Sequence, residues 1–198
     1  MLDVLIIGGG VTGCSIAREL SRYKLDVALV EAKCDVGKGT SSANSGIVHA
    51  GYDPKPGTMK ARFNVLGNLM FDQLAEDLQF AFTRCGSYVV GFDDNDMKTI
   101  DKLLIQATLN EVDGCYKVSR EELLEREPNL TPEVKGALYH PSGVCASYEM
   151  VIALAENAMQ NGVKIHCSNE VTAIKQLPDN SFEVTTTQDV YHAKHVVN

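Results

Sequence analysis

A glycine-rich loop between two apolar strands at the N-terminus limits the choice of fold more than any other part of this chain. Residues 2–7, apolar except for Asp3, suit a buried strand, and residues 27–30 suit a second one. Between them, Gly8–Gly13 has the pattern Gly-x-Gly-x-x-Gly and leads into an apolar-periodic stretch that predicts a helix. Glu31 ends the second strand, eighteen residues after Gly13. This order of strand, glycine loop, helix, strand and acid is typical of domains that bind a dinucleotide.

Each residue of the loop has a physical task in such a motif. Gly8 allows the tight turn out of the strand, Gly10 lets the backbone approach a pyrophosphate, and Gly13 lets the helix pack closely on the sheet. The free N–H groups at the start of the helix, around Val11 and Thr12, then meet the phosphates at the positive end of the helix dipole. The acid at the end of the second strand accepts hydrogen bonds from a ribose.

Length, charge and cysteine spacing exclude several classes of protein. The chain has 198 residues, 44% of them hydrophobic, which suffices for one or two domains with a substantial core. A net charge of −8 without any run of lysines or arginines disfavours nucleic-acid binding. No apolar stretch approaches the roughly twenty residues that span a bilayer, and we expect no signal peptide. Because the six cysteines have no metal-ligand spacing, we expect free thiols, no metal site and a cytoplasmic location.

The middle of the chain predicts a long loop, a long helix and a smaller segment of mixed structure. Residues 32–46 form a loop rich in glycine and hydroxyl groups, and residues 59–78 predict a helix with one apolar face. That face should be buried and consists of Phe63, Leu66, Met70, Leu74 and Leu78. The composition changes after this helix, and residues 80–146 predict an α+β insert. A helix over residues 148–161 and a parallel strand over residues 163–167 then return to the first sheet.

These elements predict an α/β fold with two domains. Residues 1–79 and 147–198 form a discontinuous nucleotide-binding domain, a Rossmann-like sheet with an antiparallel meander. Residues 80–146 form a segment of an α+β substrate domain. The chain ends on the apolar stretch 196–198 without a cap, turn or following helix, so we expect it to be the N-terminal portion of a longer protein.

The layout after the second strand favours FAD over a nicotinamide cofactor. A nicotinamide dehydrogenase normally adds its third parallel strand within a few tens of residues. This chain instead has a loop over residues 32–57, as flavin enzymes do when they thread the cofactor along it. The loop side chains that suit pyrophosphate and ribitol are Thr40, Ser41, Ser42 and Asn44. A solvated loop whose hydroxyls complete local turns is the alternative interpretation, and an NAD-dependent dehydrogenase is the rival function.

Three blocks of this sequence resemble one superfamily of flavoproteins. They are Gly8–Gly13 with Glu31, the block Thr40–Gly51, and residues 55–60. Together they resemble the D-amino-acid-oxidase-type superfamily, and within it the branch of anaerobic glycerol-3-phosphate dehydrogenase and L-2-hydroxyglutarate oxidase. The resemblance runs over all 198 residues. It implies a glutathione-reductase-type FAD-binding sheet and a flavin-linked oxidation of a small hydroxylated anion.

The resemblance also implies site residues, substrates and electron acceptors. The backbone of Val171 would touch the adenine, and Ser45–His49 would run beside the isoalloxazine ring. The complete predicted FAD set is Gly8, Gly10, Val11, Thr12, Gly13, Glu31, Ala32, Thr40, Ser41, Ser42, Asn44, Ser45, Gly46, His49 and Val171. Glycerol 3-phosphate is the first substrate candidate, L-2-hydroxyglutarate the second, and an amine or amino acid the third. Oxygen, a quinone or a partner protein would accept the electrons, and peripheral membrane contact stays open.

His49 and Lys55 are the candidates for chemistry on the substrate. An imidazole suits a base that accepts the hydroxyl proton while hydride leaves the adjacent carbon for flavin N5. For His49, covalent attachment to flavin and a purely structural role are the alternatives. Lys55 would form part of an anion site with Lys60 and Arg62, against the alternative of solvated surface cations. A third class of function is a binding module that holds FAD or ADP without activity of its own.

Overall fold

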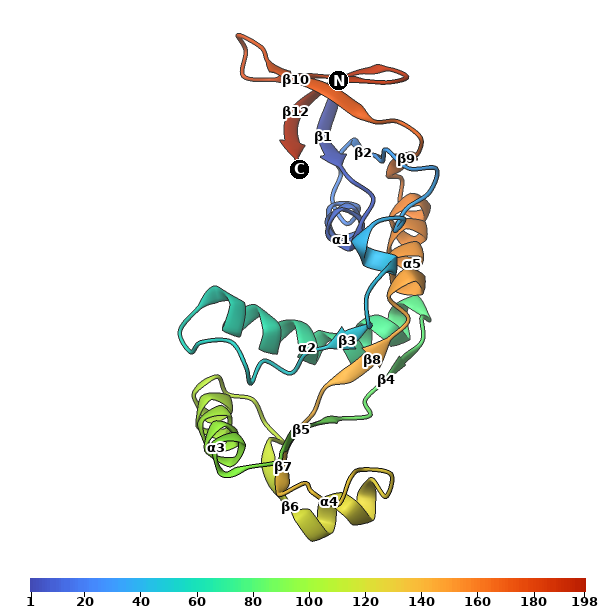
Figure 1. Cartoon of the computed structure of the whole chain (residues 1–198). Coiled ribbons are helices and arrows are strands. Elements are labelled where there is room, and N and C mark those ends of the chain that lie inside the picture. Colours follow the sequence, from blue (N-terminus) through green and yellow to red (C-terminus); the bar gives the residue numbers. More distant parts are fainter. The chain divides into compact units, whose positions relative to one another are not determined.

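The N-terminal strand lies inside a six-stranded sheet in the computed structural model, which describes residues 1–198 (Figure 1). β1 (Leu2–Ile7) pairs in parallel with β2 (Val27–Val30) on one side and with β12 (Val190–Val197) on the other. β9 (Lys164–His166) pairs in parallel with β2 at the edge of the sheet. The parallel strand predicted after the insert is thus present beside the second strand.

An antiparallel meander completes this sheet. β10 (Val171–Gln176) pairs with β11 (Phe182–Thr186), and β11 pairs with β12. The strand order is β10-β11-β12-β1-β2-β9, with parallel pairing from β12 to β9 and antiparallel pairing from β10 to β12. The predicted fold class, a Rossmann-like parallel sheet with an antiparallel meander, is confirmed.

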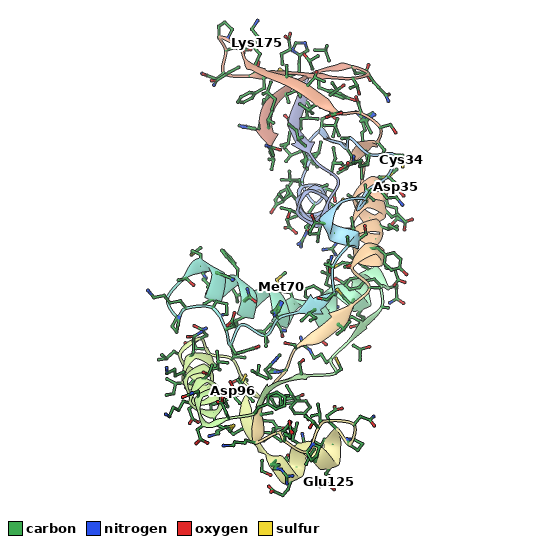
Figure 2. All side chains as sticks on the ribbon, viewed as in Figure 1. Cys34, Asp35, Met70, Asp96, Glu125 and Lys175 are labelled. Carbon is green, nitrogen blue, oxygen red and sulfur yellow. The ribbon has the colours of Figure 1, made fainter.

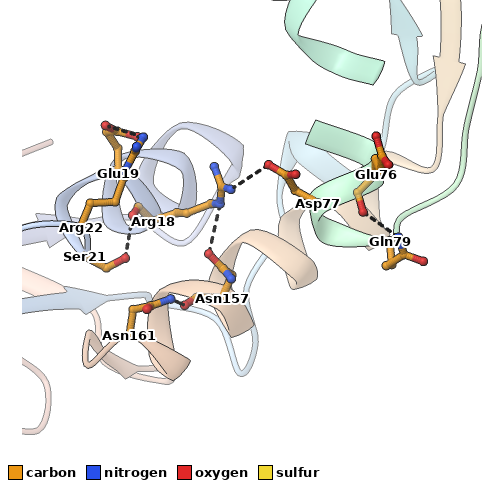
Figure 3. Close-up of polar contacts among 9 residues, drawn as sticks. All are labelled: Arg18, Glu19, Ser21, Arg22, Glu76, Asp77, Gln79, Asn157 and Asn161. Atoms are coloured by element: carbon orange, nitrogen blue, oxygen red, sulfur yellow. Dashed lines mark hydrogen bonds and ion pairs between the residues drawn. The ribbon is translucent and has the colours of Figure 1, made fainter. Parts of the chain in front are cut away.

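Apolar residues at every position of β2 are buried, as expected for a central parallel strand that is covered on both faces. α1 (Val11–Leu20) and α5 (Ser147–Gln160) pack against each other. Arg18 of α1 strengthens this contact, because its Nε donates to Asn157 Oδ1 of α5 at 3.1 Å (Figure 3). Its Nη2 also lies 3.7 Å from Oδ2 of Asp77, near the end of the long helix α2 (Met59–Leu78). One core cluster is formed by side chains of four neighbouring strands of the sheet: Leu5, Ala28, Val30, Val184 and Ala193.

Contacts within the chain divide it into two compact units. Unit 1 comprises residues 1–45, 76–81 and 146–198, and unit 2 comprises residues 46–75 and 82–145. The division of the chain into functional domains stays a prediction, and the compact units differ from it mainly in one stretch, apart from shifts of one or two residues at the insert boundaries. Residues 46–75 belong to unit 2 and not to the unit that contains the glycine loop.

Two amide side chains explain why this stretch belongs to unit 2. Asn110 Nδ2 donates to the carbonyl oxygens of Gly51 and Pro54 at 2.9 and 2.8 Å. Gln106 Nε2 donates to the carbonyl oxygens of Tyr52 and Asp53. Gln106 lies in α3 (Asp94–Leu109) and Asn110 is the residue at its C-terminal cap, so the turn before the long helix is bonded to the insert.

Unit 2 contains two small antiparallel sheets. The first has the order β5-β7-β6 and the second the order β3-β8-β4. Their strands are β3 (Ile47–Val48), β4 (Phe82–Thr83), β5 (Ser87–Gly91), β6 (Tyr116–Ser119), β7 (Gly136–His140) and β8 (Gly143–Cys145). The helices around the first sheet are α3 (Asp94–Leu109) and α4 (Arg120–Arg126). Asp93 caps α3 by accepting the Asn95 and Asp96 N–H groups, and Ser119 caps α4.

The long helix α2 has the predicted bounds, Met59–Leu78, but the predicted burial of its apolar face is wrong. Phe63 is 57% exposed, and Met70, labelled in Figure 2, is 65% exposed. Only Ala61 and Asn68 of this helix are buried. Helical periodicity shows which side chains share a face, but it does not show whether another part of the chain covers that face. None of the helices combines the length and apolar character of a membrane-spanning helix.

Candidate functional site

The glycine loop joins β1 to α1 and borders a cavity of about 220 Å³ in unit 1. Gly8 has a φ of +104°, a conformation that favours glycine. A Cβ atom on Gly13 would overlap the carbonyl oxygen of Gly8, so α1 can approach the loop this closely only through a glycine. Six residues of the predicted FAD set line the cavity: Gly8, Gly10, Val11, Thr12, Gly13 and Ser41.

The start of α1 is completed by a side chain from the hydroxyl-rich loop. Its N-cap residue is Gly10, which has no side chain to cap the helix. Instead the Val11 N–H donates to Ser41 Oγ at 3.0 Å across 30 residues of sequence. Ser41 belongs to a short 3-10 helix over Thr40–Ser42, and a Cβ atom on Gly10 would lie 3.2 Å from its Oγ. The two loops therefore meet at the N-terminal end of α1, where backbone N–H groups and the helix dipole favour a phosphate.

Glu31 follows β2, and backbone N–H groups hold its carboxylate on two sides. Oε2 accepts the Gly9 N–H at 2.5 Å, and Oε1 accepts the Lys33 N–H at 2.8 Å. The backbone of Glu31 is itself fixed, because its N–H donates to the His166 carbonyl at 2.9 Å and its carbonyl accepts the Asn169 N–H at 2.8 Å. The acid therefore has a defined orientation beside the glycine loop. A carboxylate held in this way suits the hydroxyl donors of a ribose.

The other loop residues of the predicted FAD set are mostly exposed. Asn44 Nδ2 donates to the carbonyl oxygens of Thr40 and Ser41 at 3.0 and 2.9 Å, and Ser42 Oγ lies 3.3 Å from the Gly39 carbonyl. These bonds complete local turns, as the alternative interpretation of the loop expects. Ala32 and Ser45 are exposed, Val171 is half-buried at the start of β10, and Gly46 and His49 belong to unit 2.

His49 is exposed, but its backbone is anchored by a buried amide from α2. Asn68 Nδ2 donates to the carbonyl oxygens of Val48 and His49, both at 3.2 Å, and Asn68 is 6% exposed. Arg84 holds Asn68 in turn, through Nη1 to Asn68 Oδ1 at 2.8 Å and Nη2 to the Asn68 carbonyl at 2.7 Å. Asp72 Oδ2 pairs with Arg84 Nη2 at 2.6 Å. Sequence patterns did not predict this network, although Asn68 is a polar residue among apolar neighbours in the helix.

A second histidine, His140, lies within electrostatic reach of His49. It is 5% exposed, its Nδ1 is 2.8 Å from Ser142 Oγ, and its ring packs on Tyr52 with the centroids 4.2 Å apart. Burial, with a smaller effect of His49, lowers the pKa of His140 to about 4. His140 is therefore neutral at pH 7.

The lowered pKa of His140 predicts that acid destabilises the protein. Its folded-state pKa of about 4 lies below the unfolded value of about 6.5. Between about pH 6.5 and pH 4 the unfolded state therefore binds more protons than the folded state. Stability therefore falls as the pH drops through the window, by about 2–3 kcal/mol for this group. We expect the urea midpoint of a His140→Gln variant to change less between pH 7 and pH 4 than that of the unaltered chain. Parallel pH dependences for the two proteins would contradict the assignment.

The predicted anion-site residues Lys55, Lys60 and Arg62 are all exposed in unit 2. The guanidinium of Arg62 lies 5.8 Å from the centre of the Phe63 ring. Of the three cations, only Arg62 lines a second cavity, of about 610 Å³. No group of three or more histidine, cysteine or acidic side chains in the structure is arranged to hold a metal ion.

The whole chain matches a known family of flavoproteins. The model of the DAO family, described as "FAD dependent oxidoreductase", matches residues 3–198. The chain belongs to this family. The resemblance found in the sequence is thereby confirmed, and FAD is the cofactor of the family.

Two curated relatives and one solved structure show how far the similarity extends. A glycerol 3-phosphate dehydrogenase of Caloramator mitchellensis is 52% identical over 199 residues, which cover this whole chain and 41% of that protein. A glycerol 3-phosphate oxidase of Mycoplasma pneumoniae is 35% identical over 94% of this chain and 50% of that protein. The structure of L-alpha-glycerophosphate oxidase from Mycoplasma pneumoniae with FAD bound superimposes with a TM-score of 0.92 at 33% identity, covering 98% of this chain and 53% of that one. The chain thus spans about half the length of these relatives, or less.

Proposed function

We propose that this chain holds FAD and serves the oxidation of a small hydroxylated anion, with glycerol 3-phosphate as the first candidate substrate. The observation that carries the proposal is the cradle in unit 1 where the glycine loop, Ser41 and Glu31 meet at the N-terminal end of α1. The 52% identity to the Caloramator glycerol 3-phosphate dehydrogenase supports this choice of substrate.

Each part of the cradle has a task in holding FAD. The N–H groups of the first turn of α1, with the hydroxyl of Ser41, bind the pyrophosphate. Glu31 would hold the adenosine ribose, Val171 would contact the adenine through its backbone, and Ala32 would contribute to the cofactor site. The hydroxyl and amide side chains of Thr40, Ser42 and Asn44 would bind the ribitol. When bound, FAD supplies the acceptor for the hydride that leaves the substrate carbon.

Residues of unit 2 are proposed to act on the substrate. His49 accepts the proton of the substrate hydroxyl, and Asn68 fixes the backbone from which His49 projects. Lys55 attracts the substrate anion. Covalent attachment of flavin to His49 and a structural role for His49 are the competing assignments.

Three further candidates follow the first. L-2-hydroxyglutarate is the second substrate candidate, because L-2-hydroxyglutarate dehydrogenase of Escherichia coli strain K12 is 30% identical over 89% of this chain. Amines and amino acids come third, since one fold serves many substrates. An FAD-binding module without activity of its own is the candidate from another class, because the chain spans 41% of the Caloramator protein. Oxygen, a quinone or a partner protein accepts the electrons, in a cytoplasmic setting.

The test is an absorption and binding experiment on the purified chain. After incubation with FAD and gel filtration we expect a yellow protein that releases its flavin on acid precipitation, and we expect calorimetry to show ADP binding. Glu31→Gln should weaken ADP binding about tenfold or more, because charged hydrogen bonds contribute about 1.5–3 kcal/mol. Glu19→Gln, an exposed acid on α1, is the matched control and should bind ADP normally.

The outcomes separate the candidate functions. Flavin that stays with the acid-precipitated protein would identify a covalent link and direct attention to His49. Anaerobic bleaching of the flavin by glycerol 3-phosphate, but not by L-2-hydroxyglutarate, would establish the substrate. A yellow protein that no substrate bleaches would favour the binding module. A colourless chain that binds neither FAD nor ADP would refute the proposal for this chain.

A further inference from the structure

Two cysteines, Cys34 and Cys167, flank a backbone hydrogen bond beside the turn that follows β2. The Ser168 N–H donates to the Lys33 carbonyl at 2.7 Å. The peptide group between Lys33 and Cys34 is therefore hydrogen-bonded to the peptide group between Cys167 and Ser168. The α-carbons of Cys34 and Cys167 each flank one of these two bonded peptide groups, and a disulfide joins α-carbons about 4.4–6.8 Å apart. Cys34, in the turn after β2, is labelled in Figure 2.

The two thiols differ in their access to solvent. Cys34 is exposed, whereas Cys167 is half-buried, and both are free. Burial raises the pKa of Cys167, and the nearby Asp35, Glu31 and Cys34 raise it further. Cys167 also raises the pKa of Cys14, so Cys14 is the competing partner, but Cys14 is buried in α1 and Cys34 is exposed. Cys34 is therefore the thiol that an oxidant from solvent reaches first.

We propose that Cys34 and Cys167 form a thiol pair that a peroxide oxidises to a disulfide. The bond would join the turn after β2 to the connection between β9 and β10, next to the carboxylate of Glu31. Neither the family membership nor the proposed function assigns a role to these cysteines.

The oxidation is balanced by a single hydrogen peroxide molecule. The Cys34 thiolate attacks one peroxide oxygen, so an S–O bond forms, the O–O bond breaks, and hydroxide leaves and takes up a proton as water. The Cys167 thiolate then attacks the sulfur of the Cys34 sulfenic acid, so the S–S bond forms and a second water leaves. Two thiols lose two electrons and two protons, and the peroxide is reduced to two waters.

A local source of peroxide would follow from the proposed function. Oxygen that accepts two electrons and two protons from a reduced flavin becomes hydrogen peroxide. This source rests on the proposed function with oxygen as the acceptor, whereas the thiol pair itself does not. Added peroxide therefore tests the pair independently of flavin.

In the experiment, the purified FAD-free chain is treated with hydrogen peroxide and its remaining thiols are then blocked. The intact mass, the disulfide-linked peptides and the melting temperature are measured. We expect a mass loss of about 2 Da from the thiol pair and a peptide that links Cys34 to Cys167, both reversed by dithiothreitol. We expect the melting temperature to rise by about 5 °C, because the bond restrains the unfolded chain. Cys34→Ser and Cys167→Ser should lose all three changes. Cys85→Ser, an exposed cysteine of unit 2, should keep them.

Two results would overturn the pair. One is a peroxide-treated chain whose thiols are consumed without any peptide linking Cys34 to Cys167. The other is the same mass loss in Cys34→Ser as in the unaltered chain, which would place the disulfide elsewhere. A chain that binds no FAD but forms the link would refute the proposed function alone, and a yellow chain without the link would refute the thiol pair alone.

Discussion

Gly13→Ala is expected to abolish FAD and ADP binding and to destabilise unit 1 by more than about 3 kcal/mol. The added Cβ would overlap the Gly8 carbonyl oxygen, which is backbone and cannot rotate away as a side chain does. Either α1 moves off the loop or the turn after β1 opens. Both movements disrupt the N–H groups at the helix start. Urea unfolding and ADP calorimetry would measure the two losses, and we expect ADP affinity to fall at least about a hundredfold.

Gly39→Ala is the matched control for this substitution. Gly39 lies in the hydroxyl-rich loop, has a φ of −105°, and a Cβ atom there would meet nothing within 4 Å. We expect this variant to unfold and to bind ADP like the unaltered chain. If Gly13→Ala matched it in both measurements, the close approach of α1 to the loop would have no role in nucleotide binding.

The parts of the fold that the sequence predicted correctly depend on short-range patterns. β1, β2 and α2 have the predicted bounds, because apolar runs and periodicity report local structure directly. The cradle was predictable for the same reason, since the glycine spacing and the acid after β2 lie within one strand-helix-strand unit. The bond between Gly9 and Glu31 shows how closely the two ends of this unit meet.

The parts that the sequence did not predict depend on contacts between distant residues. The Val11 N–H finds Ser41 thirty residues away, and no local pattern indicates which loop hydroxyl takes that position. The wrong prediction for α2 has the same origin. Phe63 and Met70 share an apolar face of the helix, but no distant part of this chain covers it. The apolar pattern of α2 did not indicate that Asn68 holds the backbone of His49. To predict which distant residues contact each other, the three-dimensional fold is needed as well as the periodicity of the sequence.

Asn68→Leu should have the second largest effect, because one buried amide satisfies several backbone and side-chain groups at once. The substitution conserves volume but leaves the Val48 and His49 carbonyls without their donor and Arg84 without its acceptor. Buried groups left unsatisfied cost about 1–3 kcal/mol each, so we expect a loss of about 3 kcal/mol in the free energy of unfolding. We also expect faster amide hydrogen exchange across residues 47–50, because the amide no longer restrains this segment.

Two further variants show whether the donor atoms of Asn68 carry this effect. Asn68→Asp keeps an acceptor for Arg84 but removes the donor to the Val48 and His49 carbonyls, so hydrogen exchange in this segment should still accelerate. Asn95→Leu changes an exposed asparagine of α3 and should alter stability by less than about 0.5 kcal/mol. If Asn68→Leu protected residues 47–50 as well as the unaltered chain does, the packing of α2 alone would position His49. If only the two Asn68 variants lose protection, the amide donor positions the segment that carries the proposed base.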